Sequence, residues 1–346
     1  MRKIIFAALL SFCMLLCACS AQNPSSTATV SVPVASSTVT PSSTANTKLS
    51  PTTGKATTKE YAPIGVMIEN EKSARPQTGL QAADIVYEGH MEGKITRFFC
   101  IFNDNTPTMV GPIRSARTYW VKIQQEYGCI FVHFGGPEGT TSANVYNLIK
   151  SVKIPKRIDG LTAVNTTLNG EKIMWRDSSR SAPHNAYANL EVIKQYYENN
   201  EPSEHTFLFD DSKVYSGTAA TTVTLDFQSD SKVIYKYDAE NKVYKRFQGT
   251  TAFTDKATGK QVEVTNVIVQ IVDEKLVDTE HLNITTEGSG KAIFFLDGKR
   301  IEGTWQKSTM QSRTIYKDQS GNEIVLHSGN TWIHLLPSSS YVSSSN

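Results

Sequence analysis

Between residues 60 and 205, short and almost continuously apolar segments alternate with segments whose apolar side chains recur at helical spacing. Short apolar runs bounded by turn residues predict buried strands, and apolar positions three or four apart predict helices. The expected strands are 64–68, 84–88, 96–102 and 129–134, and the expected helices are 115–127, 143–151 and 189–199. This alternation predicts a mixed α/β first domain over residues 60–205.

From residue 223 the pattern changes to short segments in which apolar and polar residues mostly alternate. The clearest are 223–227, 233–237 and 243–247, which are separated by Asp, Asn and Gly turns, and similar segments continue to residue 335. This spacing is typical of antiparallel strands. We therefore expect a mainly antiparallel β second domain over residues 206–337, and an α+β class for the whole chain.

The first residues have the pattern of a secretory signal. An apolar run, 4–16, follows Arg2 and Lys3, and it is shorter than the roughly 20 residues that a membrane-spanning helix needs. Leu16-Cys17-Ala18-Cys19 is typical of a lipobox, so residues 1–18 would be removed and Cys19 would carry a diacylglyceryl group. The alternative is an ordinary signal cut after Ala18 or Ala21. The lipobox interpretation predicts a membrane-anchored lipoprotein on the extracytoplasmic face.

Residues 19–59 are dominated by Ser, Thr, Pro and Ala and have no acidic or aromatic side chain. Such a segment buries too little apolar surface to offset the entropy of ordering it. We expect a disordered tether here, and a disordered tail at 338–346, which is again rich in serine. Only Cys100 and Cys129 remain in the body; both lie in apolar runs, which favours buried free thiols over a disulfide.

The small net charge and the absence of several catalytic motifs argue against several classes of protein. The formal net charge of +2 is too small for a surface that binds nucleic acid through its phosphates, so no nucleic-acid partner is expected. The chain has no His-Glu-x-x-His zinc motif, no complete phosphate-binding loop and no Gly-x-Ser-x-Gly turn. We therefore expect no metal and no cofactor, although an unfamiliar enzyme is not excluded.

Polar side chains gather at the ends of the expected strands of the first domain. Guanidinium groups bind carboxylates and phosphates through two parallel hydrogen bonds, so several arginines in one cleft would bind an anion. The candidate ligand-binding residues are Asn70, Arg75, Arg97, Arg114, Ser115, Arg117, Arg180 and Asn185. The alternative is that Arg97, Arg114 and Arg117 form structural salt bridges with nearby acids.

Glu88, His133 and His184 are the candidate catalytic acids or bases. Burial would favour the neutral form of Glu88 and make it a general acid. His133 lies inside an apolar strand, where a core histidine bonded to the backbone is an equal alternative. His184 lies in a polar loop after a proline, where packing explains it less well. The other histidines, including His334, fit no functional pattern.

At these residues the sequence resembles the YerB-like lipoproteins, a two-domain family of unknown function. The resemblance covers residues 62–337 and is carried by Val66-Met67-Ile68-Glu69-Asn70, Arg75-Pro76-Gln77-Thr78-Gly79, Ala83-Asp84-Ile85-Val86-Tyr87-Glu88, Thr96-Arg97-Phe98, Gly111-Pro112-Ile113-Arg114-Ser115-Ala116-Arg117, His133-Phe134-Gly135-Gly136, Arg180-Ser181-Ala182-Pro183-His184-Asn185 and Gly329-Asn330-Thr331-Trp332-Ile333. Family members commonly have Asp where this chain has Glu69, which keeps the charge. The resemblance implies a lipoprotein setting and no established reaction.

Together these patterns favour a protein that binds an anionic component of the cell envelope through an Arg/His cleft. Its expected partners are the membrane, through the lipid anchor, and a cell-wall polymer or an envelope protein. Two alternatives stay open. One is an enzyme that acts on wall glycan or peptide, and the other is an adaptor of the wall synthesis machinery that binds proteins alone.

Overall fold

The computed structural model describes residues 47–154, 156–196 and 205–346. The expected signal peptide, Cys19 and most of the expected tether lie outside these residues. Strands account for 41% of the structure and helices for 14%, so the fold is largely β. Among the described residues, no helix is both long enough and apolar enough to cross a membrane.

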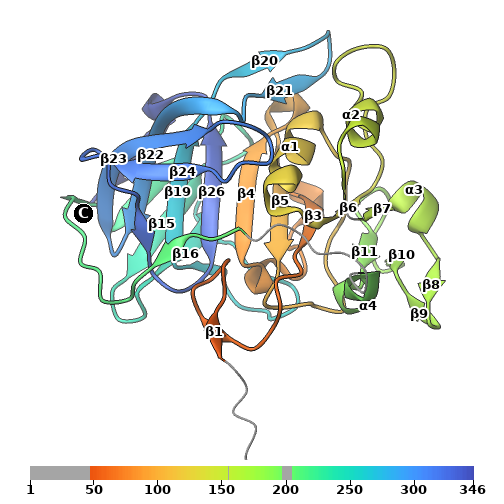
Figure 1. Cartoon of the computed structure of the whole chain (residues 1–346), viewed down its shortest axis with the longest axis horizontal. Helices are drawn as coiled ribbons and strands as arrows, with labels where there is room; N and C mark the ends of the chain where they lie inside the picture. Colours follow the sequence, from red (N-terminus) through yellow and green to blue (C-terminus); the bar gives the residue numbers. More distant parts are fainter. Residues whose placement is uncertain (1–46, 155, 197–204) are drawn as a thin grey trace, which may run out of the picture. The chain divides into compact units, whose positions relative to one another are not determined.

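A mixed sheet of eleven strands forms the centre of the molecule (Figure 1). Its order is β13 (Thr218–Ala219), β23 (Lys299–Lys307), β22 (Gly288–Leu296), β19 (Asn266–Ile271), β26 (Thr331–Leu336), β4 (Ile85–His90), β5 (Thr96–Phe102), β3 (Ile64–Glu69), β6 (Ile130–His133) and β7 (Arg157–Asp159), with β24 (Ile315–Asp318) beside β23. A second sheet has the order β17 (Thr251–Ala252), β16 (Val243–Gln248), β15 (Val233–Asp238), β14 (Thr222–Leu225) and β27 (Val342–Ser345), with β18 (Glu263–Val264) beside β16.

Among the described residues the α-helices all precede residue 205, and short strand pairs complete the structure. The helices are α1 (Thr118–Tyr127), α2 (Val145–Ser151), α3 (Gly160–Ala163) and α4 (Leu190–Lys194). The pairs are β1 (Lys48–Leu49) with β2 (Ala56–Thr57), β8 (Thr167–Leu168) with β9 (Glu171–Lys172), β10 (Met174–Arg176) with β11 (Ala186–Ala188), β12 (Leu208–Phe209) with β25 (Val325–Leu326), and β20 (Glu274–Leu276) with β21 (Leu282–Ile284). The expected strands are confirmed to within a few residues.

The central sheet runs across the boundary expected near residue 205. Strand β26, from the second half, pairs in parallel with β4 from the first half, and Thr331 lies opposite Ile85. Residues 45–346 accordingly form one compact unit. The sequence halves are therefore joined by backbone hydrogen bonds within one sheet.

Two apolar cores lie on opposite faces of the sheet. On one face, Met67 and Phe99 pack with Trp120 of α1, which overlies β4 and β5 in Figure 1. On the other face, Ile68 and Phe98 pack with side chains of the second sheet, including Tyr235. Because successive side chains of a strand point to opposite faces, each strand contributes to both cores. Cys100 and Cys129 are buried free thiols, as expected.

The expected disorder of residues 47–59 and 338–346 is wrong. Ser50 and Thr52 are buried, and their hydroxyl groups donate hydrogen bonds to Asp104 (2.7 Å) and Asp84 (2.7 Å). We call residues 50–55 the strap. Amino-acid composition does not predict an ordered strap, because its side chains are held by carboxylates distant in the sequence rather than by apolar contacts. At the other end, β27 pairs with β14 along four residues and buries Val342.

Asp84 is 2% exposed, and burial, followed by the charge of Asp104, raises its pKa to about 7. The folded state therefore holds a proton that the unfolded state releases at a lower pH. Its contribution to stability is complete below about pH 4 and falls as pH rises toward 7. Since one pKa unit corresponds to about 1.4 kcal/mol, the full change is at most roughly 4 kcal/mol.

We predict that Asp84→Asn reduces the loss of stability between pH 4 and pH 7, because the amide oxygen still accepts the Thr52 hydroxyl and no group ionises. Urea unfolding of the compact unit at several pH values measures this. Glu240→Gln, at an exposed turn, is the control. An unchanged pH profile in Asp84→Asn would contradict the assignment.

Candidate functional site

The end of β3 and the start of β5 direct polar side chains to both faces of the sheet. Glu69 lies opposite Arg97 in the β3–β5 register, on the same face as Met67 and Phe99. Thr96 is on the other face, where its hydroxyl receives a hydrogen bond from Asn70 (2.7 Å). Two polar clusters result, one beside α1 and one beneath the second sheet.

We call Arg97, Arg114 and Arg117 the arginine cluster; it lies on the α1 face. Arg97 is 4% exposed, and its guanidinium donates one hydrogen bond to the carbonyl oxygen of Ser115 (2.8 Å). Its Nε is buried without a hydrogen-bond partner. Burial, and then the charges of Arg117 and Arg114, lower the pKa of Arg97 to about 10. Among the described residues, no carboxylate forms a salt bridge with it.

The other two arginines of the cluster do have acidic partners. Arg117 binds Glu92 through two hydrogen bonds of 2.9 and 2.7 Å, and the Nε of Arg114 lies 3.0 Å from Glu69. Their side chains are 15% and 30% exposed. The salt-bridge alternative therefore describes Arg117 and in part Arg114, but it does not describe Arg97.

His184 belongs to the same cluster of charges, because its Nδ1 lies 2.9 Å from the Glu69 carboxylate. Its Nε2 lies 2.9 Å from the Ser73 hydroxyl, and that hydroxyl donates its single proton to Glu71. Both ring nitrogens consequently face oxygen atoms that can accept hydrogen bonds. A relay of the hydrolase type would need the Ser73 proton on His184, and this geometry directs it elsewhere.

Glu88 lies in the second cluster, and its expected role as a neutral general acid is not supported. The side chain is 0% exposed and forms a salt bridge of 2.9 Å with Arg246, and its oxygens also accept hydrogen bonds from Asn70 and Thr96. Burial alone would raise the pKa of Glu88, but Arg246 and His334 outweigh it and lower the pKa to about 2. The enclosed carboxylate is therefore ionised and has a structural role.

Arg246, the partner of Glu88, is fully buried among aromatic rings. Its guanidinium carbon lies 4.5 Å from the ring centre of Phe253 and 4.8 Å from that of Trp332. The Tyr235 hydroxyl accepts a hydrogen bond from Arg246 (3.1 Å) and lies 3.0 Å from His334. Sequence reasoning missed Arg246 and His334. The available signal was the alternation of β16, which places Arg246 on the same inward face as Tyr244.

His133 is separate from both clusters. It is fully buried, stacks on Phe131 and lies with its Nδ1 2.9 Å from the carbonyl oxygen of Gly135. Burial lowers its pKa, so it is neutral at physiological pH. The alternative of a core histidine bonded to backbone describes this geometry.

The other candidate residues support loops rather than one cleft. Arg75 binds Asp230 (2.9 Å) and the carbonyl oxygen of Asn70 (2.7 Å). Arg180 donates to the carbonyl oxygens of residues 74 and 76, and Asn185 accepts from Arg176. Ser115 contributes its carbonyl oxygen to Arg97 and lies before α1, because the helix begins after its N-cap residue, Arg117.

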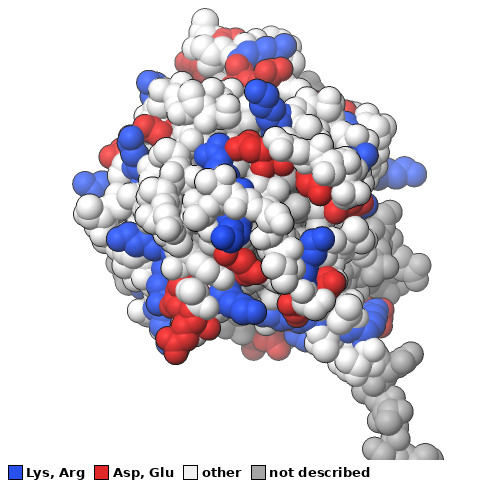
Figure 2. Space-filling view, turned by 90° about the vertical axis from the view of Figure 1, so that its left-hand side faces the viewer, with Lys and Arg blue, Asp and Glu red and all other residues white. Residues whose placement is uncertain are grey.

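The face of the molecule shown in Figure 2 has no broad field of one charge. On the face shown in Figure 2, Lys and Arg side chains are interspersed with Asp and Glu. Among the described residues, no group of three or more His, Cys, Asp or Glu side chains could hold a metal ion. The large exposed apolar side chains, Leu49, Leu161, Leu208, Val214 and Leu276, come from five different segments.

Fold and site together define a largely β protein whose two halves share one sheet, with a partly buried arginine cluster at the strand ends. Residues 51–203 match the family model "Protein of unknown function (DUF3048) N-terminal domain", and residues 223–333 match the corresponding C-terminal domain. The chain is 30% identical over 290 residues to "Putative lipoprotein YerB" of Bacillus subtilis (strain 168), covering 80% of this chain and 82% of that protein. The chain belongs to this YerB-like family.

A crystal structure of the YerB protein from Bacillus subtilis is similar to this fold. The TM-score is 0.75 at 30% sequence identity, and the match covers 86% of this chain and 100% of the other. The family descriptions record no activity, so the function has to be argued from the site.

We predict that Arg246→Ala destabilises the compact unit by roughly 3–5 kcal/mol, because it leaves the buried Glu88 charge without its cation. Urea unfolding at pH 7 measures this. Arg300→Ala is the matched control, since Arg300 pairs with Glu302 at the surface, where such pairs contribute about 0–1 kcal/mol. Equal losses in the two variants would mean that the Glu88–Arg246 pair is not a special contributor.

Proposed function

We propose that this protein is a lipid-anchored envelope protein that binds an anionic component of the cell envelope through the arginine cluster. The anchor would be Cys19, as the lipobox predicts, and the name of the Bacillus subtilis relative supports that setting. On this basis the protein is held at the extracytoplasmic face of the membrane, where anionic wall polymers are within reach.

Arg97 is the observation that carries the proposal. Burying a cation is costly unless a counter-charge or a full set of hydrogen bonds compensates it. Arg97 has one carbonyl partner, and burial followed by the charges of Arg117 and Arg114 lowers its pKa, which the Glu69 charge offsets only in part. An anion bound beside it would supply the missing compensation.

The charges around Arg97 leave the cluster positive. The guanidinium groups of the three arginines face two paired carboxylates, Glu69 and Glu92. The Nε of Arg114 faces Glu69, and no partner of its terminal nitrogens is found in the described part of the chain, so these are available for a second anion. This supports a carboxylate or phosphate ligand, which a guanidinium binds through two hydrogen bonds.

The two alternatives, an enzyme acting on the cell wall and a protein-binding adaptor, receive less support. Glu88 and His133, two of the three acid–base candidates, are fully buried, and each is held by neighbouring groups of the protein. Catalysis would therefore depend on His184, which is held between Glu69 and Ser73. For an adaptor, a contiguous apolar patch would be the expected feature, and the exposed apolar side chains come from separate segments.

We predict that the compact unit, residues 45–346, is retained by isolated cell wall and that Arg114→Ala lowers its apparent affinity at least fivefold. Co-sedimentation at low and moderate salt measures retention, and analysis of the supernatant detects released fragments. Arg157→Ala is the matched control, because its side chain is 33% exposed, close to the 30% of Arg114, but lies on β7. It should be retained like the wild type.

Equal retention of all three proteins would reject the arginine cluster as the binding site. Release of soluble fragments by the wild type, lost in His184→Ala, would instead establish the enzyme alternative. Wall from which phosphate-containing polymers have been removed separates the two ligand classes: retention is lost for a phosphate and kept for a carboxylate.

A further inference from the structure

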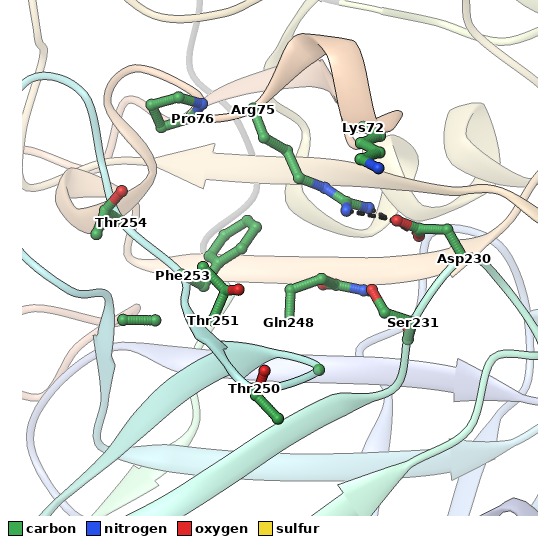
Figure 3. Close-up of a pocket in the computed structure, with 12 residues that line it drawn as sticks. Lys72, Arg75, Pro76, Asp230, Ser231, Gln248, Thr250, Thr251, Phe253 and Thr254 are labelled. Carbon is green, nitrogen blue, oxygen red and sulfur yellow. Dashed lines mark hydrogen bonds and ion pairs between the residues drawn. The ribbon is translucent and has the colours of Figure 1, made fainter.

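A cavity of about 500 Å³ lies on the other side of the 72–76 turn, where the two halves of the chain meet (Figure 3). One wall is formed by Lys72, Arg75 and Pro76 of the first half. The opposite wall is formed by the β14–β15 turn and by residues 248–254, which connect β16 to β17 and continue beyond it. We call this space the seam cavity.

Two cationic side chains, Arg75 and Lys72, lie in the first wall of the seam cavity, and they differ in how they are paired. Arg75 is held by two bonds to Asp230 (2.9 and 3.2 Å), so its charge is largely used within the protein. Lys72 extends from the same turn toward Asp230 in Figure 3, and no salt bridge or hydrogen bond of its ammonium group is found among the described residues. The ammonium group is therefore available to an anionic ligand.

Apart from Asp230, which is paired with Arg75, the opposite wall presents neutral hydrogen-bonding groups. It carries the hydroxyls of Ser231, Thr250, Thr251 and Thr254 and the amide of Gln248, beside the ring of Phe253. Hydroxyl groups both donate and accept hydrogen bonds, which matches the hydroxyls of a sugar. The volume lies within the range of roughly 300–1,000 Å³ that is typical of small-ligand sites.

We infer that the seam cavity binds one saccharide unit carrying an anionic substituent, with the hydroxyl wall binding the sugar ring and Lys72 binding the anion. This site is separate from the arginine cluster. Glu69 and Arg97 lie on the α1 face of the sheet, whereas Arg75 joins the seam cavity to Asn70, whose amide donates to Glu88. No residue lines both sites, so this inference does not rest on the proposed function.

N-acetylmuramic acid and N-acetylglucosamine are the probes, because they share a sugar ring and differ by one carboxylate-bearing ether. Titration of the compact unit, followed by NMR chemical shifts, gives the dissociation constants. We expect the wild type to bind the acidic sugar about tenfold more tightly. Lys72→Ala should remove that preference and leave the neutral sugar unaffected. Lys275→Ala, which removes an exposed lysine on β20, should bind like the wild type.

A second variant tests the cavity rather than the charge. Ala252→Trp, at an exposed position on β17, fills the seam cavity and should abolish binding of both sugars while the fold persists by circular dichroism. Arg114→Ala should bind both sugars normally even where it loses retention on wall. No saturable binding of the acidic sugar by the wild type, or an unchanged preference in Lys72→Ala, would overturn the inference.

Discussion

The fully buried ion pair of Glu88 and Arg246 is the interaction on which the arrangement of the two halves depends. Removing two charges from water costs several kcal/mol for each ion, and recovering that cost requires hydrogen bonds to the remaining polar atoms. Here Asn70, Thr96, Tyr235 and His334 surround the pair and partner most of these atoms, while the Nε of Arg246 is buried without a hydrogen bond. A shift of one residue between β26 and β4 would move His334 to the opposite face, so this polar core fixes the register of the joint sheet.

The alternation of strands explains how two clusters with different charge balance occur at one end of the sheet. Thr96 and Arg97 are neighbours in sequence but face opposite cores. On one face the cation has a carboxylate, hydroxyls and aromatic rings around it, so its charge is compensated within the protein. On the other, Arg97 lies near Arg114, Arg117 and the Glu69 carboxylate, and among the described residues it forms no salt bridge. The first arrangement stabilises the fold, and the second is the one on which the proposed anion site rests.

Much of the fold could be predicted from hydrophobic periodicity. Strand β3 and helix α1 lie close to their expected ranges because each packs an apolar face that local sequence reveals. The pairing of β26 with β4 could not be predicted, since it joins residues more than 200 positions apart and leaves no local pattern. The strap was missed for a similar reason, because its hydroxyl groups need Asp84 and Asp104, which come later in the chain.

The candidate site, like the fold, could be predicted from the sequence only in part. Residue types and spacing located Arg97, Arg114, Arg117 and His184, which the structure brings around Glu69 and Ser115. They could not reveal that Glu88 would meet Arg246 and be ionised. Its protonation depends on a partner 158 positions away, and burial without that partner would have given the opposite result.

The strap also has a mechanical consequence. Tension arriving from the amino-terminal side would act first on the pairing of β1 with β2 and on the hydroxyl–carboxylate bonds of Ser50, Thr52 and Thr53, and only afterwards on the backbone pairing of β3. Those few bonds can yield and re-form while the sheet stays intact. The strap would thus detach and re-form under tension before the central sheet unfolds, which would protect the folded body from force applied at an attachment point.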